Sequence, residues 1–334
     1  MTMYSPRPEI ARRFAGRLID VARQGRGDLG FFGRMVAGIR AFRPDIVHTH
    51  VHNGKYWGRL AALVAGVPAI VHTEHNSDFR ASFPVRLATT ALHAKTARII
   101  AFSRGHAARI AAAERVPLDR FAVLANGISP HRPALDRAAA REQLGGGERA
   151  IVVHVGRLMP VKNQMLAIAA FAASPSLRAR ARLVLVGDGP DEAALRAAAA
   201  EGGVAGDVRF AGYRDDVLDL LPGADVVVLT SRNEAMPLVA LEAMFARIPI
   251  TTVPWDGSDE LFESGRLAAI APDYEPAHLA QTLLHELEAP ERLRERAELA
   301  HAVALKQYTL DAAIARHVAF YRELAIRSRP GARD

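Results

Sequence analysis

The sequence contains no cysteine, no long hydrophobic run and few aromatic residues. The lack of cysteine excludes disulfide bonds, thiolate nucleophiles and thiolate metal ligands. No run reaches the roughly 18 consecutive apolar residues that a membrane-spanning helix requires. The opening residues, MTMYSPRPEIARRF, also lack the apolar stretch of a secretory signal. We therefore expect a cytoplasmic protein.

Basic residues are unevenly distributed along the chain. Residues 1–130 carry 19 Lys and Arg against 8 Asp and Glu, whereas the remaining residues carry 24 against 28. Aromatic residues make up only 6% of the chain and form no stacking platform beside the arginines, so we expect no nucleic-acid partner. Two interpretations of the basic excess stay open: solvated helix faces, and attraction to an anionic membrane surface or a phosphate-bearing substrate.

Short apolar runs alternate with amphipathic segments through all 334 residues. Strands that are apolar throughout and separated by helices indicate parallel sheets covered on both faces, so the sequence predicts a doubly wound α/β fold. The ten predicted strands lie at residues 44–50, 69–75, 97–103, 121–126, 150–156, 181–187, 208–212, 224–230, 248–253 and 267–272.

The length of the chain favours two domains over one. A composition break, NGISPHRPALDRAAAREQLGGGERA, gathers turn residues and a glycine run ahead of the fifth strand. We predict an N-terminal domain over residues 1–130, a C-terminal domain over residues 131–308, and a helix with a tail over residues 309–334.

Two motifs follow predicted strands, where open α/β sheets bind ligands. In HVGRLMPVKNQ, a strand ends at Gly156, and Arg157 and Lys162 bring two cations within reach of one anionic ligand. In LVLVGDGPDE, Gly187 and Gly189 allow a tight turn, but the third glycine of a dinucleotide fingerprint is missing, which disfavours a nicotinamide enzyme.

The third motif, TSRNEAMPLVALEAM, follows the eighth strand. Pro237 suits the first position of a helix, and no capping side chain stands directly before it. The N–H groups of Leu238 and Val239 are therefore expected to be available to a diphosphate. Glu234 lies in the loop and Glu242 lies more than one turn into the helix. Surface charge is the alternative interpretation of either glutamate alone.

In this order and spacing, HVGRLMPVKNQ, LVLVGDGP, VRFAGYRDDV and TSRNEAMPLVALEAM resemble the donor-binding half of glycosyltransferase family 4, which comprises retaining enzymes with the GT-B fold. The resemblance implies two Rossmann-like domains facing each other across a cleft, with the nucleotide-sugar held by the C-terminal domain and the acceptor by the N-terminal one. It also implies that no metal ion and no other cofactor is needed.

The resemblance assigns roles to individual residues of the C-terminal half. Arg157 and Lys162 neutralise the donor diphosphate, Glu234 contacts the transferred sugar, and Glu242 binds the ribose hydroxyls. The remaining donor-binding positions are the backbone from Ala235 to Val239 and the residues Gly156, Gly187, Tyr213, Met236 and Leu238. Arg214 is expected near the base together with Tyr213. The pair Asp215 and Asp216 is not the Asp-x-Asp metal motif of the other large glycosyltransferase fold.

The N-terminal half contributes VHTEHN, which resembles the segment whose histidine faces the donor sugar. His75 is the best match and is assigned a catalytic role beside Glu234; His72 is the second choice. A buried structural histidine is the alternative interpretation. His48 and His50 alternate along a strand as some metal ligands do, but no further ligand recurs at a suitable spacing, so we predict no metal site.

The chain departs from the family pattern at three places. Ala235 replaces a glycine, so its Cβ either narrows the sugar pocket or demands a different backbone angle. PWDGSDELFESG follows the ninth strand in place of a Gly-Gly turn. The usual first strand and its Gly-rich loop are missing before PDIVHTH, which predicts a truncated N-terminal domain whose sheet lacks a central strand.

The resemblance implies a retaining glycosyltransferase that moves a sugar from a nucleotide-diphosphate-sugar to a lipid-linked or polysaccharide acceptor, at the inner face of the membrane if the basic half binds anionic lipid. A catalytically weak or inactive nucleotide-sugar-binding protein or partner subunit is the first alternative. A nucleotide-sugar epimerase is the second, and it would need more acid and base groups than the motifs supply.

Overall fold

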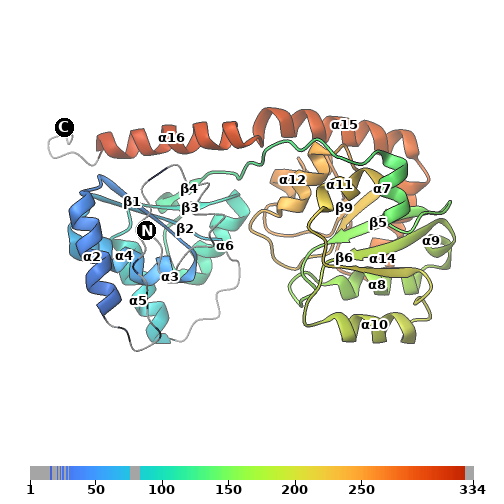
Figure 1. Cartoon of the computed structure of the whole chain (residues 1–334), viewed down its shortest axis with the longest axis horizontal. Coiled ribbons are helices and arrows are strands. Elements are labelled where there is room, and N and C mark those ends of the chain that lie inside the picture. Colours follow the sequence, from blue (N-terminus) through green and yellow to red (C-terminus); the bar gives the residue numbers. More distant parts are fainter. Residues whose placement is uncertain are drawn as a thin grey trace. The chain divides into compact units, whose positions relative to one another are not determined.

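The protein was studied as a computed structural model that describes residues 30–75 and 83–327, together with residues 16, 21, 23, 25 and 28. The chain forms two compact units. Unit 1 comprises Met1–Phe102, Ala107–Leu124 and Arg316–Asp334, and unit 2 comprises Ser103–His106 and Ala125–Ala315. In each unit, helices flank a parallel sheet (Figure 1).

Unit 1 contains a parallel sheet of four strands in the order β1-β2-β3-β4. The strands are β1 (Ile46–His50), β2 (Ala69–Thr73), β3 (Arg98–Ala101) and β4 (Phe121–Val123). The described helices are α2 (Gly30–Phe42), α3 (Val51–Asn53), a π-helical turn (Gly54–Gly58), α4 (Arg59–Ala65), α5 (Phe83–Ala94), α6 (Arg104–Glu114) and a 3₁₀ turn (Leu118–Arg120), and α16 (Leu310–Arg327) begins in unit 2 and continues here.

The described sheet of unit 1 is continuous, because each strand pairs with the next one along the chain. This pairing concerns only β1 to β4, so the expectation that the sheet lacks a central strand stays a prediction. The predicted absence of a first strand and Gly-rich loop concerns residues that lie largely outside the described part of the chain, and it stays a prediction.

Unit 2 contains a parallel sheet of six strands in the order β10-β9-β8-β5-β6-β7. The strands are β5 (Ala150–Val155), β6 (Ala181–Val186), β7 (Val208–Gly212), β8 (Val226–Leu229), β9 (Ile250–Thr252) and β10 (Ala269–Ile270). Its helices are α7 (Arg137–Gln143), α8 (Gln164–Ala173), α9 (Pro175–Arg180), α10 (Glu192–Glu201), α11 (Val217–Leu220) with a 3₁₀ turn (Leu221–Gly223), α12 (Leu238–Phe245), α13 (Ser258–Leu261), α14 (Pro276–Leu287) and α15 (Pro290–Gln307).

The core of unit 2 has one layer on each face of this sheet. Ile151 and Val153 of β5 pack into the cluster that contains residues of α12 and α15, whereas Val152 packs into the cluster that contains residues of α8 and α14. Because successive side chains of a strand point to opposite faces, apolar residues at every position bury both faces. This explains why the predicted strands are apolar throughout.

Local sequence signals set several helix boundaries. The Asp136 carboxylate accepts a hydrogen bond from the Ala139 N–H, and the Ser174 hydroxyl accepts one from the Leu177 N–H, so both residues act as N-caps. Gly66 ends α4 with φ +78°, a left-handed conformation that favours glycine.

The predicted fold class is confirmed: two parallel-sheet, Rossmann-like units follow each other along the chain. All ten predicted strand segments contain a strand. No helix within the described ranges is both long and apolar enough to cross a membrane.

Candidate functional site

The candidate site of unit 2 lies where β5 and β8 end. These strands are neighbours in the sheet, so the loops that follow them run side by side. The Arg232 N–H donates a hydrogen bond to the Val161 carbonyl (3.0 Å), which joins the two loops through their backbones. The two loops carry the predicted diphosphate and sugar residues.

Lys162 and Glu234 form an ion pair between these loops. The Lys162 ammonium nitrogen lies 2.6 Å from Glu234 Oε1, and both side chains are largely but not fully buried. Arg157, which precedes Lys162 on the same loop, is exposed. The structure thus brings the predicted phosphate-binding lysine and the predicted sugar-binding glutamate into direct contact.

The start of α12 lies directly after Glu234 along the chain, one residue later than predicted. Pro237 is the N-cap, with ψ 119°, and Leu238 is the first helical residue. The prediction of Pro237 at the first helical position is therefore wrong, because Pro237 takes the extended conformation typical of an N-cap. Pro237 offers no side-chain acceptor, and in the described part of the chain the N–H groups of Leu238 and Val239 have no hydrogen-bond partner. Two N–H groups are thus available at a positive helix end.

Glu242 lies one turn further along α12. Its carboxylate is half-buried, and burial raises its pKa above the ordinary value. Within the described residues its carboxylate oxygens form no ion pair or hydrogen bond. A half-buried carboxylate without a partner is destabilising unless something else donates to it, and ligand hydroxyls can do so.

The glycines of this region allow two loops to approach closely. Gly187 has φ +142°, and a Cβ there would lie 2.1 Å from the Gly156 carbonyl oxygen. Gly189 has φ +158° and would place a Cβ 2.2 Å from the Leu158 carbonyl oxygen. The structure therefore gives both glycines a packing reason, because the loop after β6 lies against the loop after β5.

Ala235 does not have a positive φ, so its Cβ causes no backbone strain. Both expectations for this position, a narrower pocket and a different backbone angle, stay predictions. Met236 is partly buried, and its sulfur accepts a hydrogen bond from the Asn126 N–H (3.3 Å). Tyr213 is 71% exposed, whereas Arg214 is bound to Asp216 (2.7 Å) and to Gln143 (2.6 Å). Tyr213 is thus accessible to a ligand, and Arg214 is occupied within unit 2.

The candidate residues of unit 1 are histidines at the ends of β1 and β2. His75 is exposed, and its Nε2 forms a hydrogen bond of 3.0 Å with Nδ1 of His50. His72 is fully buried and bonded to Thr49 (2.9 Å), which fits a structural histidine. Burial lowers the pKa of His72 to about 4. His75 is therefore the more accessible of the two predicted candidates.

His48 uses both of its ring nitrogens inside unit 1. Nδ1 bonds to the Tyr321 hydroxyl and Nε2 bonds to the Thr73 hydroxyl (2.6 Å). Burial and the neighbouring His50 lower the pKa of His48 to about 3. His48 thus holds the ends of β1 and β2 to α16. No three His, Asp or Glu side chains within the described residues are arranged to hold a metal ion.

Sequence reasoning missed a buried ionic cluster beside His75. The Lys55 ammonium lies 2.5 Å from Glu74 and also contacts Glu114, which in turn bonds to His93. Burial alone would lower the pKa of Lys55, but Glu74 and Glu114 raise it. The sequence offered one signal of this cluster. Lys55 and Arg59 are four residues apart in a helical pattern and so lie on the same face, and Arg59 is buried in the structure.

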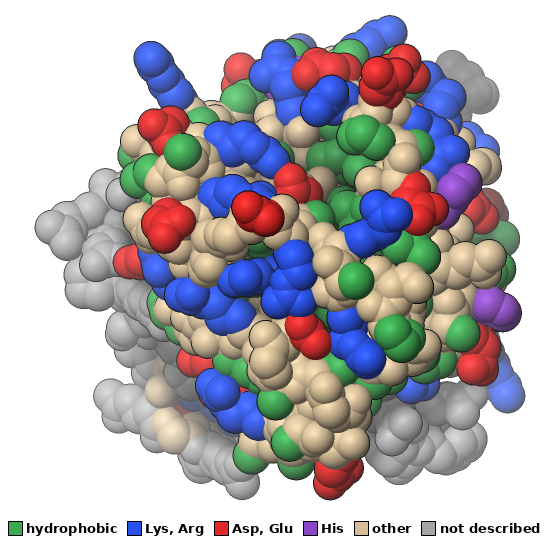
Figure 2. Space-filling view, turned by 90° about the vertical axis from the view of Figure 1, so that its right-hand side faces the viewer, with side chains coloured by type: hydrophobic (Ala, Val, Ile, Leu, Met, Phe, Trp, Pro, Cys, Tyr) green, Lys and Arg blue, Asp and Glu red, His purple; other side chains and the backbone are tan. Residues whose placement is uncertain are grey.

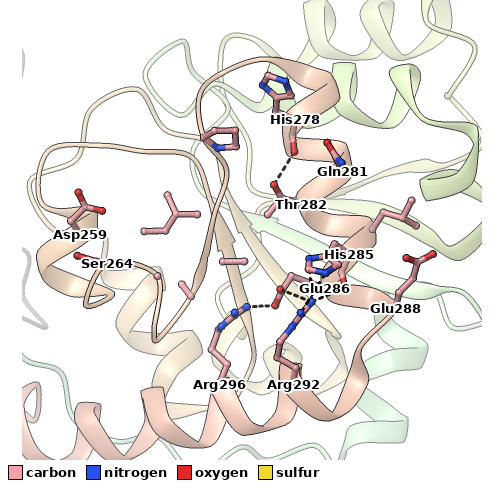
Figure 3. Close-up of a pocket in the computed structure, with 16 residues that line it drawn as sticks. Asp259, Ser264, His278, Gln281, Thr282, His285, Glu286, Glu288, Arg292 and Arg296 are labelled. Carbon is pink, nitrogen blue, oxygen red and sulfur yellow. Dashed lines mark hydrogen bonds and ion pairs between the residues drawn. The ribbon is translucent and has the colours of Figure 1, made fainter.

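A pocket of about 820 Å³ in unit 2 contains none of the predicted residues. It lies between α13, β10, α14 and α15, and Figure 3 shows Glu286 between Arg292 and Arg296. Glu286 lies 3.3 Å from Arg292 and also contacts Arg296, so the carboxylate neutralises much of the charge of these arginines. This pocket is separate from the loops that carry Lys162 and Glu234.

Comparison with known proteins shows the family of the chain. Residues 136–301 match the family described as glycosyl transferases group 1, and residues 2–132 match glycosyltransferase family 4. The chain is 29% identical to the alpha-D-kanosaminyltransferase of Streptomyces kanamyceticus over 306 residues, covering 84% of this chain and 78% of that protein.

A second relative comes from Escherichia coli. The chain is 30% identical over 239 residues to the UDP-Gal:alpha-D-GlcNAc-diphosphoundecaprenol alpha-1,3-galactosyltransferase. The match covers 68% of this chain and 62% of that enzyme, so the chain spans less than two thirds of this relative.

Among solved structures, the chain resembles HepE of Anabaena in complex with UDP-glucose. The TM-score is 0.80 at 21% identity, with 92% of this chain and 85% of HepE covered. Two Rossmann-like units with this likeness define the GT-B class of glycosyltransferase structures. Within that class, the chain belongs to glycosyltransferase family 4: that family's model matches its N-terminal part, and the model of glycosyl transferases group 1 matches its C-terminal part.

Proposed function

We propose that the protein is a retaining glycosyltransferase that moves a sugar from a nucleotide-diphosphate-sugar to a lipid-linked or polysaccharide acceptor. The observation that carries this proposal is the contact of Lys162 with Glu234 beside the uncapped start of α12. A cation, free N–H groups and a carboxylate at neighbouring strand ends suit a diphosphate joined to a sugar.

In the proposed reaction, the bond between the anomeric carbon of the sugar and the diphosphate oxygen breaks. Negative charge then develops on the leaving diphosphate. Lys162, Arg157 and the N–H groups of Leu238 and Val239 stabilise this charge electrostatically. The Glu234 carboxylate accepts hydrogen bonds from hydroxyls of the transferred sugar, and the Glu242 carboxylate accepts them from hydroxyls of the ribose.

No side chain of unit 2 is placed as an obvious nucleophile, so we propose a front-face substitution. The acceptor oxygen forms a bond to the anomeric carbon on the side from which the diphosphate leaves. The acceptor proton passes to a diphosphate oxygen, so the products are the glycosylated acceptor and the protonated nucleoside diphosphate. His75 is proposed as the group of unit 1 that orients the sugar. The proposed reaction uses no metal ion.

The proposal is tested by a transfer assay on the full chain. Radiolabelled UDP-sugars, GDP-sugars and ADP-sugars are incubated with the protein and with lipid and polysaccharide extracts. We expect one donor to transfer label with retention at the anomeric carbon, as read by NMR of the product. Donor binding without turnover would favour the inactive alternative, and interconversion of nucleotide-sugars would favour an epimerase.

Replacing Glu242 by Ala is expected to weaken UDP binding by about 10- to 100-fold. The reason is the loss of charge-assisted hydrogen bonds from the ribose hydroxyls, each of which contributes about 1.5–3 kcal/mol. Isothermal titration calorimetry measures the change, with the exposed Glu201→Ala as the matched control.

A second nucleotide separates ribose binding from a general loss of structure. The penalty of Glu242→Ala should be smaller for 2′-deoxy-UDP than for UDP, because that ligand lacks one hydroxyl. Because burial raises the pKa of Glu242, UDP affinity in the wild type should fall on acidification as this carboxylate is protonated. An equal penalty for both nucleotides would remove Glu242 from the ribose site.

We also propose that unit 1 binds an anionic membrane surface. Phe42, Leu60 and Val64 are exposed apolar side chains at α2 and α4, and Arg40 of α2 donates to the Val64 carbonyl (2.8 Å). Apolar side chains beside cations suit an interface with anionic lipid. The face in Figure 2, by contrast, mixes acidic and basic side chains.

Vesicle flotation tests this surface. The wild type should float with vesicles of phosphatidylglycerol at low salt and not with phosphatidylcholine alone, because surface attraction is electrostatic and screened by salt. Phe42→Ser combined with Val64→Ser should reduce flotation at least about threefold, because both changes remove apolar surface that the lipid would bury on binding. Leu118→Ser, at another exposed apolar position of unit 1, is the control. A wild type that stays in the unbound fraction at low salt would contradict the membrane proposal.

A further inference from the structure

His154 is an unexpected residue in the core of unit 2. It lies on β5, and the other five residues of that strand are Ala, Ile or Val. The side chain is 2% exposed. Its Nε2 lies 3.0 Å from the Thr230 hydroxyl, whereas Nδ1 is buried and has no partner within the described residues. An unpartnered buried nitrogen lowers stability, so the fold alone does not explain a histidine here.

The hydrogen bonds around Thr230 fix the state of the imidazole ring. The Thr230 hydroxyl donates its single proton to the Lys162 carbonyl (2.9 Å). It must therefore accept at its oxygen, and His154 Nε2–H is the donor. This requires the neutral ring with its proton on Nε2. Burial and the positive charge of Lys162 lower the pKa of His154 to about 4, so the ring is neutral at physiological pH.

The residue after Lys162 has a left-handed backbone conformation. Asn163 has φ +53° and ψ +42°, and its side chain makes no capping hydrogen bond to α8. Among non-glycine residues, asparagine adopts this conformation comparatively readily. The hydrogen bond from Thr230 to the Lys162 carbonyl lies directly before this turn of the chain.

Only one of the links between the two loops begins in the core. Arg232 N–H to Val161 is a backbone bond, and Lys162 to Glu234 is an ion pair at a partly exposed site. The chain from His154 through Thr230 to Lys162 starts at a fully buried side chain on a strand. A side chain packed on a rigid strand fixes a loop more strictly than two loops fix each other.

We propose that His154 is a positioning residue that sets the backbone of Lys162 by making the Thr230 hydroxyl donate to the Lys162 carbonyl. The inference rests on the proposed function in one respect, namely that Lys162 binds the donor diphosphate. The effect of His154 on the loop after β5 can be measured without a ligand and does not depend on the proposed function. This role gives a reason for a buried histidine with one unpaired nitrogen on β5, because it determines where the phosphate-binding ammonium lies.

Three variants test the inference. His154→Leu removes the donor and the unpaired nitrogen, Thr230→Val removes the relay hydroxyl, and His154→Gln keeps an N–H donor on a side chain of similar reach. Amide hydrogen exchange of residues 157–163 is measured in the free protein, UDP affinity by calorimetry, and stability by urea denaturation.

In His154→Leu, the amide hydrogens of this loop should exchange several-fold faster than in the wild type. The variant should bind UDP roughly tenfold more weakly, as the loss of one hydrogen bond predicts. Its urea midpoint should equal or exceed that of the wild type. Thr230→Val should behave likewise, the double variant should be no worse than either single variant, and His154→Gln should stay within about threefold of the wild type.

The inference would be overturned if the amide hydrogens of residues 157–163 exchanged at the wild-type rate in His154→Leu or Thr230→Val, whether or not UDP binds. A His154→Gln variant as impaired as His154→Leu would also overturn it. If the wild type binds no nucleoside diphosphate while loop exchange responds as expected, the proposed function fails and the positioning role stands. If His154→Leu does not fold, Thr230→Val and His154→Gln decide the question.

Discussion

Replacing Lys162 by Ala is expected to lower kcat/KM for sugar transfer by about 10²–10³-fold, equivalent to about 3–4 kcal/mol of transition-state stabilisation. Lys162 contacts Glu234, three residues before the N-cap of α12, and the charge on the diphosphate grows as the sugar bond breaks. The main loss should therefore appear in kcat, with a smaller rise in KM for the donor.

The matched control is Lys306→Ala, which removes an exposed lysine of α15 in the same unit. That variant should stay within about twofold of the wild type, because exposed charges away from a site contribute little. Circular dichroism shows whether Glu234, which loses its ion-pair partner in Lys162→Ala, disturbs the fold. Unchanged kcat/KM in a folded Lys162→Ala variant would rule out its role at the diphosphate.

Replacing Lys55 by Met is expected to destabilise unit 1 by about 3–5 kcal/mol, because removing one partner of a buried ion pair leaves unpaired buried charge. The Lys55 and Glu74 side chains are 8% and 7% exposed, and Glu114 would also lose its cation. Urea denaturation measures the change. Trp57 fluorescence in a Trp255→Phe background reports on unit 1 alone, because these are the only two tryptophans.

Lys95→Met is the control, since Lys95 is an exposed lysine of the same unit.

The pH dependence of the free energy of unfolding gives a second readout. His72 and Lys55 hold the pKa of Glu74 well below its ordinary value of 4.5, against the opposing effect of burial, and His93 and Lys55 lower the pKa of Glu114.

A depressed carboxylate pKa stabilises the folded state above pH ~4.5, and this stabilisation is lost as pH falls through the folded pKa. Lys55→Met should therefore show a smaller loss of stability on acidification than the wild type does. A stability loss equal to that of Lys95→Met would show that the cluster does not support unit 1.

The sequence predicted most of the architecture because strands buried on both faces leave a strong signal. β5, β6 and β8 are apolar runs that end at motifs, so the sheet was predictable, and so was the meeting of Lys162 and Glu234 at its edge. Pro237 was misplaced by one residue because a proline is compatible with both the N-cap and the first helical position. The difference lies in its ψ angle, which the sequence does not show.

The buried polar groups were not predictable from their own segments. Lys55 meets Glu74 and Glu114, which lie 19 and 59 residues away along the chain. His154 and Thr230 are 76 residues apart. The residues around a lysine or histidine in the sequence indicate only whether it lies at the surface or in the core. Its hydrogen-bond or ion-pair partner depends on which distant segments the fold brings together.

The central claim is that the donor diphosphate binds at Lys162 and the start of α12, and a crystal structure of the full chain with UDP tests it most directly. We predict phosphate oxygens within hydrogen-bonding distance of the Lys162 ammonium and of the N–H groups of Leu238 and Val239, with the ribose hydroxyls on Glu242. UDP bound instead at Arg292 and Arg296, or at any place that leaves the Lys162–Glu234 pair without a ligand, would contradict the claim.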